Sequence, residues 1–377
     1  MWISSYVFIL LGVKLMKKIT KQGYFLIIAL VLVSLLIMSC GGDKNAESTD
    51  NAAAKVTKET VTPVAEQTRV AYIINGSLGD QSFYDSGQGG IDRLVKDFNV
   101  KATTLETNFD AAKYPQVLQS AVQWKANVIF VISYGFEDLV REYADKYPDI
   151  KFINIDTVVK NSKGTITSVD FFEEEGAFMA GAAAALLTTD ASIPGTNPEK
   201  IIGAVGGDKD PVIDAFIFGY TKGAHYIDPE IKIDSVYAGT WDDPVRGKQA
   251  AKQLYSRGSD VIFQIASLTG NGVLEAAAEE GLYAIGVDSN QNGQQPGHVV
   301  TSDLKNVGDA IYNVFASIEN NTYTPGEVLK YGIKENGVGL AIDTYTKEIL
   351  PQTSLDKLDD IRNKIISGEI VVPVYTY

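Results

Sequence analysis

Short strands alternate with helices along most of this chain, and the alternation begins at residues 69–90. Residues 70–74 are β-branched, small or aromatic, which is typical of a buried strand. A polar turn with two glycines follows, and a helix is expected to begin near Ser82. This turn therefore lies at the carboxyl edge of a parallel sheet, where open α/β sheets bind their ligands.

Strand and helix continue to alternate at the spacing of βαβ units, which requires parallel sheets with helices on both faces. Two series of strands are expected, the first at 70–74, 100–105, 127–133 and 151–156, and the second at 201–205, 231–238, 261–265 and 283–287.

The remaining segments suggest that the chain passes between two lobes more than once. We expect a crossing strand at 164–170, a small-residue helix at 175–187 that packs closely on a neighbour, a strand at 299–301, helices at 307–318 and 355–366, and an antiparallel pair over 328–341. The first α/β lobe is expected to hold residues 68–174 plus about 302–335, and the second 175–301 plus about 336–377. Two such lobes with several crossovers form a clamshell, which can close over a small ligand.

Composition excludes several classes of function. The net charge of −14 disfavours nucleic acid and anionic membrane surfaces as partners. A single cysteine rules out an internal disulfide, and two histidines, His225 and His298, cannot form a histidine-rich metal site. The P-loop, the dinucleotide fingerprint and the GxSxG motif are all missing from the sequence. We therefore expect no cofactor, no metal and no catalytic residues.

The N-terminal segment carries an export signal. Lysines precede an apolar run at 24–38, and Leu-Ile-Met-Ser before Cys40 resembles a bacterial lipobox. Residues 1–39 are expected to be a signal peptide with Met16 as the better start, and Cys40 the lipidated first residue of the mature protein. A membrane-spanning anchor is the alternative, but the run is shorter than the ~20 residues it needs. Polar residues from there to 67 predict a flexible tether.

Several side chains stand at strand ends where a ligand would bind. Phe83 and Tyr84 follow the first strand, and Trp241 stands in a similar turn of the second series. Two rings facing each other across a cleft would sandwich a planar ligand. Asp288 could accept hydrogen bonds from two hydroxyls, and Lys305 is a nearby donor. The alternatives are core packing for the aromatic residues, helix capping for Asp288 and solvent exposure for Lys305.

With these residues in order, the chain resembles the basic membrane protein family, the bacterial substrate-binding lipoproteins whose purine-nucleoside receptors serve ABC importers. The resemblance covers about residues 69–342. It is carried by Asp80-Gln81-Ser82-Phe83, Ser133-Tyr134-Gly135-Phe136, Asn154-Ile155-Asp156, Ala204-Val205-Gly206-Gly207, Gly239-Thr240-Trp241-Asp242-Asp243-Pro244, Thr269-Gly270-Asn271-Gly272-Val273, Ala284-Ile285-Gly286-Val287-Asp288-Ser289 and Thr301-Ser302 with Lys305.

The resemblance implies a type I periplasmic-binding-protein fold and no enzyme activity. The purine base of a nucleoside would stack between Phe83 and Trp241. Asp288 and Lys305 would hold the ribose, and Asp156 would lie near the base. The implied partners are the permease and ATPase subunits of an ABC importer. The implied location is the cell membrane, where the N-terminal lipid would anchor the protein facing the periplasm or the exterior.

The chain departs from the family pattern on one wall of the expected site. Ile74-Asn75 replaces the usual aspartate at the strand end, Gln81 replaces a lysine, and Tyr84 replaces an asparagine. Asn75 has both a donor and an acceptor and could take over part of base recognition, so Asn75, Gln81 and Tyr84 are also candidate ligand contacts. Two alternatives stay open, a nucleoside-processing enzyme that uses carboxylates and a surface sensor or host-facing lipoprotein without a transport role.

Overall fold

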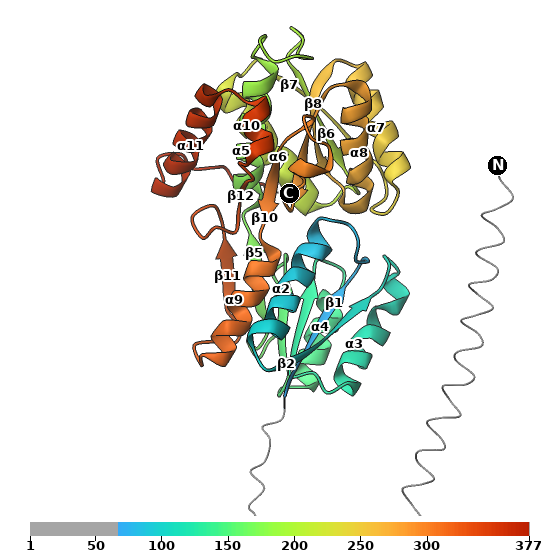
Figure 1. Ribbon diagram of the computed structural model, residues 1–377. Helices are drawn as coiled ribbons and strands as arrows, with labels where there is room; N and C mark the ends of the chain where they lie inside the picture. The colour runs from blue at the N-terminus through green and yellow to red at the C-terminus, as the bar shows by residue number, and fades with distance from the viewer. Residues whose placement is uncertain (1–66, 377) are drawn as a thin grey trace, which may run out of the picture. The chain divides into compact units, whose positions relative to one another are not determined.

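The computed structural model describes residues 67–376 (Figure 1). The predicted signal peptide with its start at Met16, the lipidation site Cys40 and the tether up to residue 66 lie outside the described residues. Two six-stranded sheets form the cores of two lobes, and helices pack on both faces of each sheet. The predicted α/β architecture of two doubly wound lobes is confirmed.

The first lobe contains a fully parallel sheet in the order β11-β5-β4-β3-β1-β2. The side chains of β1 alternate, so that Ala71 and Ile73 face one layer of helices while Val70, Tyr72 and Ile74 face the other. Helices on both sides explain why this strand is apolar throughout. The elements are β1 (Thr68–Ile74), β2 (Val100–Glu106), β3 (Val128–Ile132), β4 (Lys151–Ile155), β5 (Thr167–Phe171) and β11 (Val328–Tyr331), with α2 (Phe83–Asp97), α3 (Tyr114–Gln123), α4 (Glu137–Lys146) and α9 (Val307–Glu319).

The second lobe contains a sheet in the order β12-β10-β9-β8-β6-β7, in which β12 is antiparallel to β10 and the other pairs are parallel. Its strands are β6 (Ile201–Gly206), β7 (Lys232–Tyr237), β8 (Ser259–Ile265), β9 (Tyr283–Asp288), β10 (Val299–Lys305) and β12 (Val338–Leu340). Its helices are α5 (Glu173–Thr188), α6 (Pro211–Ile227), α7 (Pro244–Ser256), α8 (Ser267–Glu280), α10 (Thr344–Ile349) and α11 (Gln352–Ser367).

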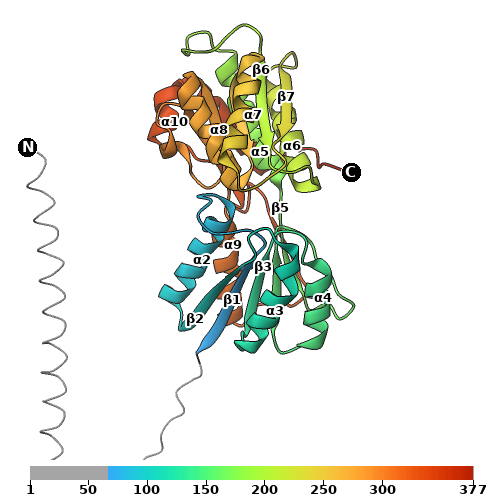
Figure 2. The same cartoon turned by 90° about the vertical axis from the view of Figure 1, so that its right-hand side faces the viewer.

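The chain passes between the lobes at three places, from β5 to α5, from β10 to α9 and from β11 to β12 (Figures 1 and 2). The prediction of an antiparallel pair over residues 328–341 is wrong. β11 pairs in parallel with β5 in the first lobe, and β12 pairs with β10 in the second. The six residues between β11 and β12 therefore form a connection between the lobes and not a hairpin turn.

The small-residue helix α5 lies almost entirely within the core of the second lobe and packs along α6. Their backbones approach so closely that a Cβ atom at Gly181 would collide with the carbonyl oxygen of Tyr220, and one at Gly223 with that of Phe178. The expected close packing of this helix is therefore confirmed. Within residues 67–376, every helix is too short or too polar to cross a bilayer.

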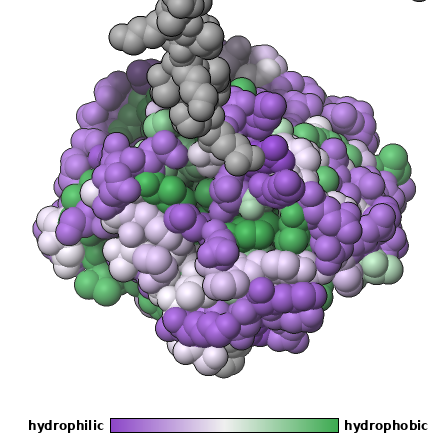
Figure 3. Space-filling model, turned by 90° about the horizontal axis from the view of Figure 1, so that it is seen from below, coloured by the Kyte–Doolittle hydropathy of each residue, from purple (hydrophilic) through white to green (hydrophobic). Residues whose placement is uncertain are grey.

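The outer end of the first lobe has a mixed surface. Hydrophilic side chains cover most of this face, and apolar side chains form separate patches among them (Figure 3). The surface therefore differs from the sheets, whose strands are largely apolar and buried.

Candidate functional site

Residues of both lobes line a cavity of about 270 Å³ at the carboxyl ends of the strands. Of the eight predicted binding residues, seven line it: Asn75, Phe83, Tyr84, Asp156, Trp241, Asp288 and Lys305. The ends of two parallel sheets thus meet at one cavity, which is the place that α/β topology favours for a ligand.

Gln81 is the predicted residue that the cavity lining does not include. It is exposed, and its φ of 55° turns the backbone into the left-handed region. Its N–H donates to Asp85 (2.9 Å), while its carbonyl accepts a hydrogen bond from the Gln291 side chain of the second lobe (3.2 Å). The main chain of Gln81 therefore joins the lobes, and its exposed side chain is not part of the cavity lining.

Four cavity residues next to strand ends have left-handed backbones. The φ angles are 69° at Ser133, 84° at Asp156, 49° at Ser267 and 63° at Asp288. Residues other than glycine seldom adopt positive φ, and such strain tends to concentrate at functional sites. These turns direct the chain along the cavity wall, where all four residues lie.

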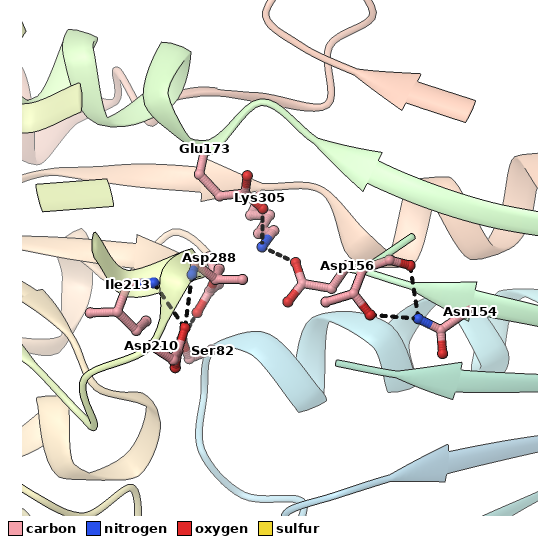
Figure 4. Close-up of polar contacts among 10 residues, drawn as sticks. Ser82, Asn154, Asp156, Glu173, Asp210, Ile213, Asp288 and Lys305 are labelled. Atoms are coloured by element: carbon pink, nitrogen blue, oxygen red, sulfur yellow. Dashed lines mark hydrogen bonds and ion pairs between the residues drawn. The ribbon is translucent and has the colours of Figure 1, made fainter. Parts of the chain in front are cut away.

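Lys305, at the end of β10, is held by carboxylates in the cavity wall (Figure 4). Its ammonium lies 2.8 Å from Glu173 Oε1 and hydrogen-bonds to Asp156 Oδ1. The exposed fractions of the Lys305, Asp156 and Glu173 side chains are 2%, 4% and 9%. Because Asp156 follows β4 and Lys305 ends β10, this ion pair connects the two lobes.

Aromatic rings surround the same ammonium. The Nζ atom of Lys305 lies 5.3 Å from the ring centroid of Phe83, 5.2 Å from that of Phe171 and 5.4 Å from that of Phe216. Rings at this distance attract a cation through their negative faces. They also exclude water, which strengthens the pairing of Lys305 with its carboxylates.

Burial and charge perturb the titration of this cluster. Burial lowers the pKa of Lys305, but Asp156, Glu173 and Asp288 raise it by more, so its ammonium stays charged. Burial raises the pKa of Glu173, against the opposing effect of Lys305. Burial also raises the pKa of Asp288 to about 7, although Lys305 and the Ser82 hydrogen bond favour its ionised form. A change of pH near neutrality therefore alters the charge of the cavity.

Asp80 lies outside the cavity lining and holds the start of α2 beside it. Its carboxylate accepts the N–H groups of Ser82, Tyr84 and Asp85, each at 3.1 Å, and so caps α2. It also accepts a 3.0 Å hydrogen bond from the hydroxyl of Ser267 in the second lobe. Its position two residues before the expected helix start was the available signal, because carboxylates favour helix N-termini.

The aromatic wall near Asn75 is fixed by hydrogen bonds within the protein. The hydroxyl of Tyr84 donates to Asn75 Oδ1 (2.7 Å), and Asn75 Nδ2 donates to the carbonyl of Tyr134 (3.4 Å). The Tyr84 ring also meets Phe109 edge to face at 6.0 Å. The side-chain oxygen of Asn75 therefore holds Tyr84, and its side-chain nitrogen holds the backbone at Tyr134.

Other polar residues of the cavity were not singled out from the sequence. Tyr114, Tyr134, Asp208 and Asp210 line it beside the predicted contacts. Tyr134 belongs to the segment 133–136, and the two aspartates follow the strand 201–206. The first of these segments was recognised as a motif, and the two aspartates follow the motif Ala204-Val205-Gly206-Gly207. Position after a strand was therefore the available signal for Tyr134, Asp208 and Asp210.

Neither histidine takes part in the site. His225 Nε2 lies 3.0 Å from the Ile231 carbonyl, and His298 Nδ1 lies 2.9 Å from the Leu282 carbonyl. In the part of the chain that the structure describes, His, Cys, Asp and Glu side chains form no group of three that could hold a metal ion.

The sequence of this chain is similar to those of known substrate-binding proteins. Residues 67–376 match the family model described as ABC transporter substrate-binding protein PnrA-like. The chain is 30% identical to "Basic membrane protein A1" of Borrelia garinii subsp. bavariensis over 354 residues, which cover 92% of this chain and 96% of that protein. It is 31% identical over 316 residues to the "ABC transporter nucleoside-binding protein BmpA" of Lactococcus lactis subsp. cremoris, covering 78% of this chain and 86% of that protein.

Solved structures confirm the periplasmic-binding-protein type of fold. An ABC transporter solute-binding protein from Aeropyrum pernix K1 superposes with a TM-score of 0.71 at 25% identity, covering 81% of this chain and 94% of that one. A solute-binding protein from Conexibacter woesei, at 17% identity, shares the fold with a TM-score of 0.64, over 82% of this chain and 100% of that one. The matching family consists of substrate-binding proteins, so the expectation that this chain is not an enzyme is confirmed. The chain belongs to the PnrA-like family of ABC-transporter substrate-binding proteins.

Proposed function

We propose that this protein captures a nucleoside, with a purine base, in the cavity between its lobes and delivers it to an ABC importer. The observation that carries the proposal is that Phe83 and Trp241, from different lobes, line one cavity together with Asp288 and Lys305. Two aromatic rings suit a planar base, and a carboxylate beside an ammonium suits the hydroxyls of a ribose. The relative in Lactococcus lactis that is named a nucleoside-binding protein supports this choice of ligand.

The contribution of each lobe explains why binding would close the cleft. A ligand whose base stacks on residues of only one lobe would bind equally well when the lobes are apart. A ring between Phe83 and Trp241 gains about 0.5–1.5 kcal/mol for each aromatic pair beyond the burial of area. This gain requires both lobes, so the ligand favours the closed arrangement.

A thermal-shift titration with adenosine, guanosine and inosine tests the proposal. A nucleoside at 100 times its dissociation constant should stabilise the protein by about 2.7 kcal/mol. Trp241→Ala should abolish most of the shift because one face of the stack is lost. Trp124→Ala is the control, since Trp124 lies outside the cavity lining and contacts Arg69. Absence of a shift with every nucleoside would reject the proposed ligand.

We also propose that the mature protein is held outside the cytoplasm by a lipid on Cys40 and works there with the permease and ATPase subunits of an importer. Membership of a substrate-binding family and the lipobox-like sequence before Cys40 support this location. Mass spectrometry of the mature N-terminus should find a diacylglyceryl cysteine. Cys40→Ser should leave the protein unlipidated, and an unchanged membrane fraction for this variant would contradict the anchor. Loss of nucleoside uptake on deletion of the protein would test delivery.

A further inference from the structure

The hydrogen-bond donors on the cavity wall are largely used within the protein. A donor that already has a partner must give it up before it can bind a ligand, which costs about as much as the bond gained. The bonds in question run from Tyr84 to Asn75 (2.7 Å), from Asn75 to the Tyr134 carbonyl (3.4 Å), from Ser267 to Asp80 (3.0 Å) and from Lys305 to Asp156.

The acceptors on the wall are carboxylates with oxygen atoms to spare. Asp156, Asp208, Asp210 and Asp288 line the cavity, and Lys305 is the cation among the described lining residues. An ionised carboxylate accepts hydrogen bonds and donates none. The wall is therefore rich in acceptors, and a matching ligand must supply donors.

Asp210, which lines the cavity, uses its two carboxylate oxygens differently. Its Oδ1 atom accepts the N–H groups of Val212 (2.8 Å) and Ile213 (3.1 Å) and caps α6 (Figure 4). Its Oδ2 atom is buried and has no backbone donor. The Tyr134 hydroxyl lies close enough to favour the ionised form of Asp210, so a ligand donor would share this oxygen with Tyr134. Burial of a carboxylate oxygen is unfavourable unless a donor reaches it.

Asp208 and Asp210 lie beside one of the expected stacking rings. The backbone of Gly207 packs so tightly against Trp241 that a Cβ atom there would collide with the indole. Asp208 is the next residue and is exposed, and Asp210 follows two positions later. A base stacked on Trp241 would thus present one of its edges to these two carboxylates.

We propose that Asp208 and Asp210 recognise a hydrogen-bond-donating edge of the base, so that the cavity selects uncharged nucleosides with an exocyclic amino group. Analogues without that group, and the corresponding nucleotides, bind more weakly. This inference rests on the proposed function and adds the chemical class of the base to it.

The physical reason for selection is the cost of an unmatched acceptor. A ligand without a donor leaves the buried Oδ2 atom of Asp210 with the Tyr134 hydroxyl as its neighbouring donor and no partner from the ligand. Sites built to hydrogen-bond a ligand reject analogues that lack the group. A 5′-phosphate adds negative charge to a cavity that is lined by four aspartates and one lysine. Repulsion at close range in such a partly buried site opposes binding of the nucleotide.

Isothermal titration calorimetry with adenosine and purine riboside tests the inference. The two ligands differ by one amino group, and purine riboside has acceptors but no donors on its base. We expect adenosine to bind the wild-type protein about tenfold more tightly than purine riboside, equivalent to about 1.4 kcal/mol. Adenosine 5′-monophosphate should bind more weakly than adenosine.

Asp210→Asn is the decisive variant. Asparagine caps helices as well as aspartate, so its oxygen can keep the two N–H groups of α6 while its NH₂ replaces Oδ2 in the cavity. The ratio of the affinities for adenosine and purine riboside should then fall from about ten to about one. Asp208→Asn should lessen the preference and weaken the exclusion of the nucleotide.

Asp243→Asn is the matched control. Asp243 also stands before a proline and caps α7 through one oxygen, which accepts Val245 N (3.0 Å) and Arg246 N (3.1 Å), but it lies outside the cavity lining. The ligand preference of this variant should equal that of the wild type.

The outcomes separate this inference from the proposed function. Equal affinities of adenosine and purine riboside for the wild type, or a preference that survives Asp210→Asn and Asp208→Asn together, would overturn the inference while nucleoside binding stands. If no nucleoside binds at all, both the proposed function and the inference fail.

Discussion

The hydroxyl of Ser82 in the first lobe donates a 2.5 Å hydrogen bond to Asp288 Oδ2 in the second lobe. Ser82 directly precedes α2, and Asp288 ends β9, so the bond connects the carboxyl ends of the two sheets. Ser289 strengthens the connection by donating to the Ser82 carbonyl at 3.1 Å. The closed arrangement of the lobes is therefore stabilised by polar contacts of the protein itself.

Ser82→Ala should weaken ligand binding by favouring the open arrangement. A hydrogen bond to a charged group contributes about 1.5–3 kcal/mol, so affinity should fall roughly 10- to 100-fold. Calorimetry measures the affinity, and small-angle scattering of the ligand-free protein should show a larger radius of gyration. Ser120→Ala is the control, because Ser120 is bonded to a carbonyl within its own helix. Unchanged affinity and radius would show that the Ser82 contact does not hold the lobes.

The raised pKa of Asp288 predicts a specific dependence of stability on pH. Its pKa is about 7 in the folded protein, mainly because of burial, and near 4 in the unfolded chain. The native state thus binds more protons than the unfolded state between these values, and stability falls as the pH rises through this window. A shift of about three units sets an upper bound of about 4 kcal/mol.

Urea unfolding at pH 5, 6, 7 and 8 measures this effect through Asp288→Asn. As the pH rises, the wild type should lose stability relative to the variant, because Asp288 becomes ionised in a buried position and asparagine does not ionise. Asp242→Asn is the control, since Asp242 is exposed and outside the cavity lining. A difference that stays constant from pH 5 to pH 8 would contradict the assigned pKa.

Much of the fold could be predicted because each βαβ unit carries its signal locally. Strand β3, for example, is a continuous apolar run between polar turns, which reflects burial on both faces. The segments β11 and β12 misled the prediction because two short strands close in sequence resemble a hairpin. Their partners, β5 and β10, are more than 30 residues away from them in the sequence, and local periodicity does not encode such pairings.

The candidate site could be predicted where function depends on the position of a residue at a strand end. This rule placed Asp156, Asp288 and Trp241 on one cavity, although their contacts with a ligand stay predictions. Gln81 lies outside the cavity lining, and a position after a strand does not encode its left-handed backbone. Glu173 was missed because a run of three glutamates resembles an exposed helix start, whereas the crossover from β5 buries this one.

Lys305→Met should destabilise the protein more than an ordinary core substitution. The change leaves Asp156 and Glu173 buried without their cation, and breaking a buried ion pair in this way costs about 3–5 kcal/mol. The double variant with Glu173→Gln should recover part of the loss, because it removes one of the two unpaired carboxylates. Urea unfolding of the single and double variants measures the coupling. Additive effects would show that Glu173 and Lys305 do not act as a pair.

Close packing of α5 on α6 gives a final prediction that compares two glycines. Gly181→Ala would place a methyl group against the Tyr220 carbonyl, whereas Gly89→Ala in α2 meets no atom within 4 Å. The first change should destabilise the protein by about 1–3 kcal/mol through overpacking. The second should stabilise it by about 0.5–1 kcal/mol, because alanine loses less conformational freedom in a helix than glycine. Both are measured by urea unfolding. Similar effects of the two substitutions would mean that helix propensity, and not the approach of the two backbones, decides the result at Gly181.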